Sequence, residues 1–197
     1  SELVGRAIAR AARATGMPRG VFSLLFDDAH EVGVKLVRRP EIRAVAFTGS
    51  RSGGQALMRI AAERDVPIPV FAEMGSINPL FVLPEAAKAR GTEIAEGLHA
   101  SFTLGVGQFC TKPGVVLVPR GAAGDGLVRA LAERTEGTTD TTMLSTRTSD
   151  GYERGLDRMR DAGAELVASG AVATSSPACG AAALWETDLE AVTGAPS

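Results

Sequence analysis

The sequence has 197 residues, which is enough for one sizeable domain or for parts of two. Hydrophobic residues make up 45% and charged residues 22%, the composition of an ordinary globular protein. The net charge of −2, with scattered basic residues, gives no field that favours nucleic acid or an anionic membrane. No apolar run reaches the roughly 18–20 residues that cross a bilayer. We therefore expect neither a nucleic-acid nor a membrane partner.

The two cysteines, Cys110 and Cys179, form no disulfide framework and stand in very different sequence contexts. The first residues are charged and rich in alanine, unlike a signal peptide, so we expect a reducing cytoplasm. The chain begins at Ser1 inside a helical pattern and ends in the weak tail Gly194–Ser197. These two ends are typical of a piece cut from a longer protein.

Helical and strand patterns alternate from the start of the chain, and the same rhythm continues in the second half. Apolar strands joined to helices by short turns are typical of a parallel sheet flanked by helices, so we predict an α/β fold. The expected helices cover residues 2–14, 29–37, 55–64, 85–103, 127–134 and 152–161. The expected strands cover residues 21–25, 43–48, 68–73, 79–83, 115–118, 165–168 and 181–185. Residues 135–142 are the most linker-like stretch.

A glycine-rich turn, Gly49–Gly54, joins an expected strand to an expected helix. Such a turn can direct backbone N–H groups and a helix N-terminus toward an anion, commonly a phosphate. It matches neither the G-x-G-x-x-G fingerprint nor a P-loop with Gly-Lys-Ser/Thr. By itself the segment is also explained as a tight turn that needs positive φ.

Two side chains have the chemistry of catalytic groups, each with a structural alternative. Glu73 closes an apolar strand, where a partly desolvated carboxylate could act as a general base or could be a solvated strand end. Cys110 follows Gly105-Val106-Gly107 after a long helix, where it could be an exposed thiolate or a buried structural thiol. Cys179, in S-S-P-A-C-G, has no partner pattern.

The only histidines, His30 and His99, fit structural roles better than catalytic ones. His99 falls within the long helix before Cys110, as a core or surface position. His30 begins a helix beside Asp27 and Asp28, which favours a role at the helix cap. No H-E-x-x-H or C-x-x-C spacing occurs, so we predict no metal.

Three segments in order resemble the aldehyde dehydrogenase superfamily, which carries F-T-G-S, E-L-G-G-x-x-P and G-Q-x-C. Here they are A-F-T-G-S at 46–50, F-A-E-M-G-S-I-N-P at 71–79 and G-Q-F-C at 107–110. Met74 and Ser76 depart from the commonest E-L-G-G wording. That departure, with G-Q-F-C-T-K-P-G at 107–114, resembles the α-ketoglutarate semialdehyde (2,5-dioxopentanoate) dehydrogenase branch. The resemblance covers essentially the whole chain.

The resemblance implies NAD(P)-dependent oxidation of an aldehyde to a carboxylate, with a keto-acid semialdehyde as substrate. Cys110 matches the nucleophile, which forms a thiohemiacetal and then a thioester, and its backbone N–H matches one oxyanion donor. Glu73 matches the base that activates the deacylating water. The positions that match the site of the cofactor, NADP or NAD, are Gly49, Ser50 and Gly54 at the phosphate turn, and Met74 and Gly75 beside the nicotinamide. Ser50 and Arg51 could also meet the 2′-phosphate of NADP.

By the same resemblance, residues 1–72 are the later half of a partial Rossmann-like cofactor-binding domain. Residues 73–197 are the first part of an α/β catalytic domain. The family's second oxyanion donor, an asparagine, would precede Ser1, and its E-x-F-G-P segment would follow Ser197; Asn78 does not match that asparagine. The resemblance implies a homo-oligomeric parent enzyme.

Two other functions are compatible with these residues. One is a truncated, catalytically inactive fragment or relative of such an enzyme. The other is a cysteine-dependent hydrolase or acyltransferase that uses His99 or His30.

Overall fold

The computed structural model describes residues 2–27, 29–139, 141–172 and 176–188. The chain folds into two compact units, Ser1–Gly75 and Ser76–Ser197. The assignment of residues 1–72 to a cofactor-binding domain and of 73–197 to a catalytic domain stays a prediction.

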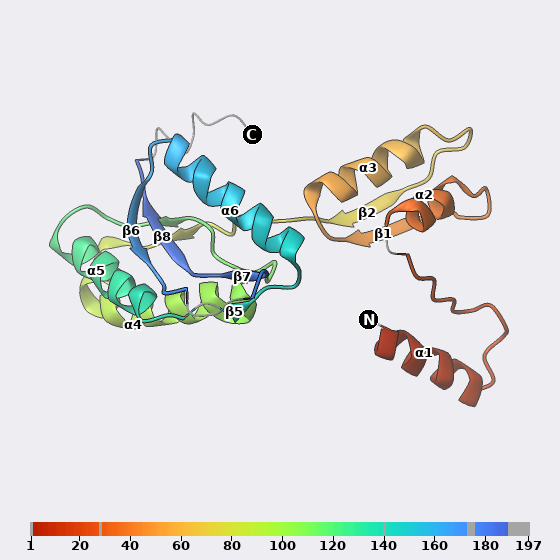
Figure 1. Ribbon diagram of the computed structural model, residues 1–197, viewed down its shortest axis with the longest axis horizontal. Helices are drawn as coiled ribbons and strands as arrows, with labels where there is room; N and C mark the ends of the chain where they lie inside the picture. The colour runs from red at the N-terminus through yellow and green to blue at the C-terminus, as the bar shows by residue number, and fades with distance from the viewer. Residues whose placement is uncertain (1, 28, 140, 173–175, 189–197) are drawn as a thin grey trace. The chain divides into compact units, whose positions relative to one another are not determined.

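The first unit is built on a parallel pair of strands, β1 and β2, with Val45 opposite Val70 and Thr48 opposite Glu73. Helix α3 packs against both α2 and β2 (Figure 1). Because the two strands run in the same direction, both carboxyl ends lie at one edge. The elements of this unit are α1 (Glu2–Ala14), α2 (Glu31–Arg38), β1 (Val45–Thr48), α3 (Arg51–Ala62) and β2 (Val70–Glu73).

Two expectations for this unit are wrong. Residues 21–25 form no strand, and Val21 and Leu25 are exposed, because an apolar run alone does not supply a hydrogen-bonding neighbour. Helix α3 begins at Arg51, four residues before the expected start. Ser50 explains the early start, since its hydroxyl accepts a hydrogen bond from the Gly53 N–H (3.2 Å) and caps the helix.

The start of α2 is fixed by Asp27. Its carboxylate accepts hydrogen bonds from the backbone N–H groups of Val32 (2.7 Å) and Ala29 (3.0 Å), and these bonds lower the pKa of Asp27. His30 stands at the cap position, as expected, but its side chain makes no capping hydrogen bond. The capping acceptor is therefore the aspartate three residues earlier, and Asp28 lies outside the described residues.

The second unit combines one parallel strand pair with two antiparallel pairs. Strand β3 pairs in parallel with β4, whereas β5 pairs with β7 and β6 pairs with β8 in antiparallel fashion. The elements are β3 (Leu80–Phe81), α4 (Pro84–Thr103), the 3₁₀ turn η1 (Leu104–Gly107), β4 (Val116–Leu117), α5 (Ala122–Glu136), β5 (Thr141–Thr142), α6 (Thr146–Asp161), β6 (Glu165–Ser169), β7 (Cys179–Gly180) and β8 (Ala183–Glu186).

Mixed helices and strands with parallel pairs confirm the α/β class. The strands from β5 to β8, however, pair in antiparallel fashion. No helix lies among the described residues between β6 and β8, and a parallel pair needs a crossover connection, usually helical. The last strands therefore pair in the antiparallel sense. No helix in the described ranges is long and apolar enough to cross a membrane.

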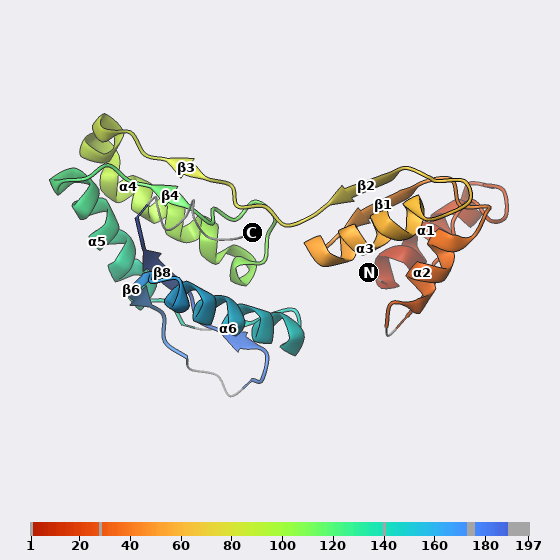
Figure 2. The ribbon, with the colours of Figure 1, turned by 90° about the horizontal axis from the view of Figure 1, so that it is seen from above.

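The core of the second unit lies between α4 and α5, which run side by side (Figures 1 and 2). Pro84 stands at the first turn of α4, where its missing N–H needs no partner. Leu127 is 1% exposed and Ala95 is fully buried. The buried cluster consists of Val82, Ala87, Ala95, Leu98, Leu127 and Leu131.

The expected linker at 135–142 is wrong for its described residues. Helix α5 continues to Glu136. Thr135 is fully buried, and its hydroxyl donates to the Leu131 carbonyl (2.8 Å) within the same helix, so the buried hydroxyl has a partner. Thr141 and Thr142 form β5. A threonine whose hydroxyl bonds to its own helix can be buried like an apolar residue, so polar composition was misleading here.

We expect Leu127→Ala to lower the free energy of unfolding by about 2–5 kcal/mol, because it leaves a cavity between α4 and α5. Urea unfolding followed by circular dichroism measures the loss. Leu144→Ala is the matched control, since Leu144 is 88% exposed. Equal effects of the two substitutions would contradict the assignment of this core.

Candidate active site

The loop that carries Cys110 begins with a left-handed turn. Gly105, Val106 and Gly107 have φ angles of 57°, 59° and 67°. A Cβ at Gly105 would meet the ring of Phe109, an exposed side chain that would have to shift, so the positive φ is the stronger reason for glycine there. Cys110 is exposed, which contradicts the alternative of a buried structural thiol.

Two side chains that precede β3 hold the Cys110 backbone. The Ser76 hydroxyl and the Asn78 amide (2.7 Å) both donate to the Cys110 carbonyl oxygen. The Asn78 amide also donates to the carbonyl of Lys112 (3.0 Å). The backbone N–H of Gly114 donates to the Ile77 carbonyl (2.6 Å), so the two segments are joined through backbone and side chains.

The side chain of Gln108 also holds the Cys110 loop, through two hydrogen bonds. Its Nε2 donates to the Gly105 carbonyl (3.1 Å), and its Oε1 accepts from the backbone N–H of Leu144 (2.9 Å). The glutamine of the G-Q-F-C segment therefore ties the left-handed turn to the residues just before α6.

Glu73 is exposed at the carboxyl end of β2, in the first unit. Its backbone carbonyl accepts a hydrogen bond from the Gly49 N–H (3.0 Å), so the glycine turn and Glu73 lie at the same edge of the β1–β2 pair. Cys110 belongs to the second unit, and the meeting of Glu73 with Cys110 in one cleft stays a prediction.

The glycines of the turn at 49–54 serve close packing rather than positive φ. None of them is among the glycines with positive φ, so the tight-turn alternative is wrong. A Cβ at Gly49 would lie 2.6 Å from the Phe47 ring, and one at Gly54 would lie 2.6 Å from Met74 Sδ. Gly54 therefore packs directly against Met74, so two of the positions expected to border the cofactor touch each other.

The N-terminal end of α3 suits an anion. Ser50, Arg51 and Ser52 are exposed, and the first turn holds no acidic residue. The partial positive charge of the helix N-terminus is therefore not neutralised by the helix's own side chains, as a phosphate site requires.

His99 has the structural role expected of it. Its Nε2 lies 2.8 Å from the Thr138 hydroxyl, and its ring meets that of Phe102 edge-on at 5.5 Å. The first contact joins α4 to a residue just after α5, and the second lies within α4 itself. No group of three histidine, cysteine or acidic side chains in the described ranges could hold a metal ion.

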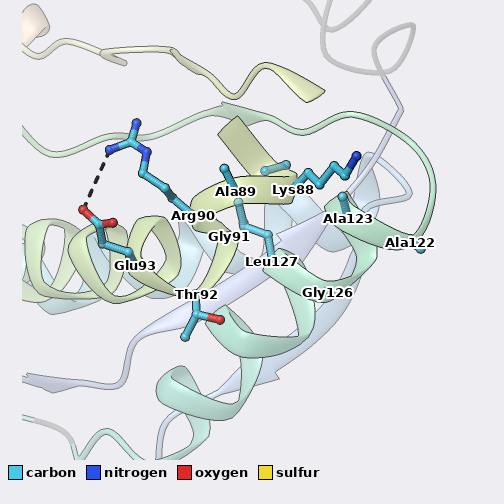
Figure 3. A pocket seen from close by; sticks show the side chains of 11 residues that line it. Lys88, Ala89, Arg90, Gly91, Thr92, Glu93, Ala122, Ala123, Gly126 and Leu127 are labelled. Atoms are coloured by element: carbon cyan, nitrogen blue, oxygen red, sulfur yellow. Dashed lines mark ion pairs between the residues drawn. The ribbon is translucent and has the colours of Figure 1, made fainter. Parts of the chain in front are cut away.

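The hollows on the described residues of the second unit include two that lie along α4. One, of about 620 Å³, borders the cysteine loop, and Asn78, Ser101 and Thr111 are among its lining residues. The other, of about 780 Å³, lies where α4 is kinked at Arg90 and meets the start of α5 (Figure 3). Arg90 and Glu93 form an ion pair at its rim (3.8 Å). At about 1.5 Å per residue along α4, this larger hollow lies roughly 15–20 Å from the end of α4 that leads to Cys110.

Sequence reasoning missed Ser76 and Asn78 as partners of the cysteine loop. Asn78 is the single asparagine of the chain, and the family resemblance bears only on an oxyanion role that its position does not match. The departure of Ser76 from the glycine of E-L-G-G was the one available signal, because a hydroxyl there adds a donor.

Comparison with known proteins gives the same family throughout. The sequence model of the aldehyde dehydrogenase family matches residues 1–183. The "alpha-ketoglutaric semialdehyde dehydrogenase 2" of Azospirillum brasilense is 45% identical over 202 residues, covering 100% of this chain and 38% of its own length. The "alpha-ketoglutaric semialdehyde dehydrogenase" of Acinetobacter baylyi is 43% identical over 171 residues, covering 86% and 32%. The chain thus spans about a third of the length of these relatives.

Solved structures show the same fold. The aldehyde dehydrogenase KauB from Pseudomonas aeruginosa has a TM-score of 0.79 at 23% identity, over 95% of this chain and 39% of its own. Proline utilization A from Bdellovibrio bacteriovorus has a TM-score of 0.73 at 22% identity, over 94% and 20%.

We expect iodoacetamide to alkylate Cys110 faster than Cys179, because Cys110 is exposed and Cys179 is half-buried. Peptide mapping after timed quenching gives the two rates. Labelling in a denaturant, where the two rates should converge, is the control. Preferential labelling of Cys179 in the folded chain would contradict the assignment of the exposed thiol.

Proposed function

The chain belongs to the aldehyde dehydrogenase family, and we propose that this protein oxidises an aldehyde to its carboxylate with NAD or NADP as hydride acceptor. The observation that carries the proposal is the exposed Cys110, held by hydrogen bonds in the loop that matches the family's nucleophile. The substrate we propose is a keto-acid semialdehyde such as 2,5-dioxopentanoate. Its support is the similarity to two relatives named for that activity.

Cys110 is the proposed nucleophile. Its thiolate attacks the aldehyde carbon, a sulfur–carbon bond forms, and the carbonyl oxygen becomes an alkoxide in a thiohemiacetal. The backbone N–H of Cys110 is the proposed donor to that oxygen. Loss of one such donor costs about 10²–10³ in rate in comparable sites, so the position of this backbone matters. Departure of hydride from the carbon leaves a thioester on Cys110.

The residues for the cofactor fit a dinucleotide. The exposed N-terminal turn of α3, with Gly49 and Ser50, would hold its phosphates, because no acidic side chain occupies that turn. Gly54 and Met74 pack against each other behind the turn, and Met74 and Gly75 would border the nicotinamide. When bound, the nicotinamide supplies the acceptor for the hydride. Arg51, exposed beside Ser50, suits the extra phosphate of NADP.

Glu73 is the proposed base for deacylation. Its carboxylate would take a proton from a water molecule whose oxygen attacks the thioester carbon. The sulfur–carbon bond then breaks, which releases the carboxylic acid and restores the Cys110 thiolate. A thiolate is a good leaving group, so one residue serves both half-reactions.

We propose that the protein works as a homo-oligomer in a reducing compartment. Residues 1–72 would contribute to cofactor binding and 73–197 to catalysis, within a homo-oligomer as the family resemblance implies. A reducing compartment such as the cytoplasm keeps a nucleophilic thiol from oxidation.

A second candidate is a folded chain that does not turn over. Reduction of NAD or NADP by this chain above the level of Cys110→Ala would exclude it. A cysteine–histidine hydrolase has less support, because His99 bonds to Thr138 and its ring packs on Phe102.

We expect Glu73→Gln to slow deacylation by about 10²–10⁴-fold while leaving acylation in place, because an amide cannot accept the water's proton. The measurement is a rapid burst of about one reduced cofactor per site, followed by slow turnover, with the acyl adduct on Cys110 seen by mass spectrometry. The control is Glu63→Gln, an exposed acid at the end of α3. Steady turnover without a burst in Glu73→Gln would refute the role of Glu73.

A further inference from the structure

We infer that Ser76 and Asn78 are positioning residues that fix the backbone of the nucleophile, an inference that rests on the proposed role of Cys110. Neither residue matches a catalytic position of the family resemblance. Their side chains nevertheless converge on one atom, the Cys110 carbonyl oxygen.

The Cys110 loop has little packing to hold it in place. Phe109, Cys110 and Thr111 are all exposed, so no buried side chain of these residues anchors the loop. A carbonyl oxygen has two lone pairs, and here two donors occupy them. With the carbonyl direction fixed, the adjoining Cα and its thiol have a restricted direction as well. Hydrogen bonds thus supply the support that burial supplies elsewhere.

Asn78 is suited to this role by its amide and by its backbone. Its Nδ2 lies within hydrogen-bond distance of three oxygens: the carbonyls of Cys110 (2.7 Å) and Lys112 (3.0 Å), and the Ser76 hydroxyl (3.1 Å). Carbonyl oxygens can only accept, so the donor end of the amide must face them. Asn78 also has a φ of 49°, a region that asparagine tolerates better than most residues.

Ser76 adds a donor that a glycine would lack. Where the family commonly has the second glycine of E-L-G-G, this chain presents a hydroxyl to the Cys110 carbonyl. Ser76 is exposed, so its side chain has no packing role that would explain it otherwise.

Two substitutions at position 78 separate hydrogen bonding from shape. Asn78→Gly accepts the positive φ and removes the donor. Asn78→Asp keeps the size but turns a carboxylate toward carbonyl oxygens, which cannot donate to it. If the donor matters, Asn78→Asp is the more damaging of the two, whereas a purely steric role predicts the reverse. At position 76, Ser76→Ala removes the hydroxyl and Ser76→Thr retains it.

The experiment measures kcat and KM for 2,5-dioxopentanoate and the cofactor, together with hydrogen–deuterium exchange of residues 104–114. We expect kcat to fall about tenfold in Asn78→Gly and about a hundredfold in Asn78→Asp, with KM for the cofactor nearly unchanged, since misplacement of about 1 Å can cost 10²-fold. Ser76→Ala should lose activity that Ser76→Thr recovers. Exchange in the loop should accelerate in Asn78→Gly and Asn78→Asp, at an unchanged Tm.

A kcat equal to that of wild type, unchanged exchange, or a milder effect of Asn78→Asp than of Asn78→Gly would each overturn the inference. Failure of the proposed function gives a different result. In that case the wild-type chain shows no aldehyde oxidation while loop exchange still responds to the substitutions, which leaves the Ser76 and Asn78 hydrogen bonds with a structural role alone.

Discussion

The parallel pairing of β3 with β4 is the constraint on which the Cys110 site depends. Leu80 lies opposite Val116, so the residues that lead into the two strands run side by side. The bond from the Gly114 N–H to the Ile77 carbonyl extends this alignment beyond the strands. Ser76 and Asn78 can reach the Cys110 carbonyl because parallel strands bring their entering segments together.

Packing between α4 and α5 fixes the segment that leads into the Cys110 loop from its N-terminal side. Their shared core, which includes Leu98 and Leu127, holds in place the part of α4 that ends at Thr103. The chain then turns through Val106, a β-branched residue with a φ of 59°. Such a conformation persists where surrounding contacts determine it. Here the contacts are the hydrogen bonds that join the Gln108 side chain to the Gly105 carbonyl and to the Leu144 N–H.

The first unit uses strand pairing in a related way. Thr48 lies opposite Glu73, and the Gly49 N–H continues the ladder to the Glu73 carbonyl. The proposed base and the proposed phosphate turn therefore share one edge of β1 and β2. Carboxyl ends of parallel strands are where open α/β sheets bind their ligands, because the helices that follow begin there.

The sequence by itself determined the local features: the helices at 2–14 and near 85–103, the glycine break before Cys110, and the motifs at Glu73 and Cys110. These depend on periodicity and on residues close in the chain. Only the tertiary structure decided that residues 21–25 form no strand, that β6 and β8 are antiparallel, and that Thr135 is buried. It alone also assigned Asn78 to the Cys110 carbonyl, 32 positions away. Strand pairing and hydrogen bonds of that range depend on how distant segments meet, which no local pattern encodes.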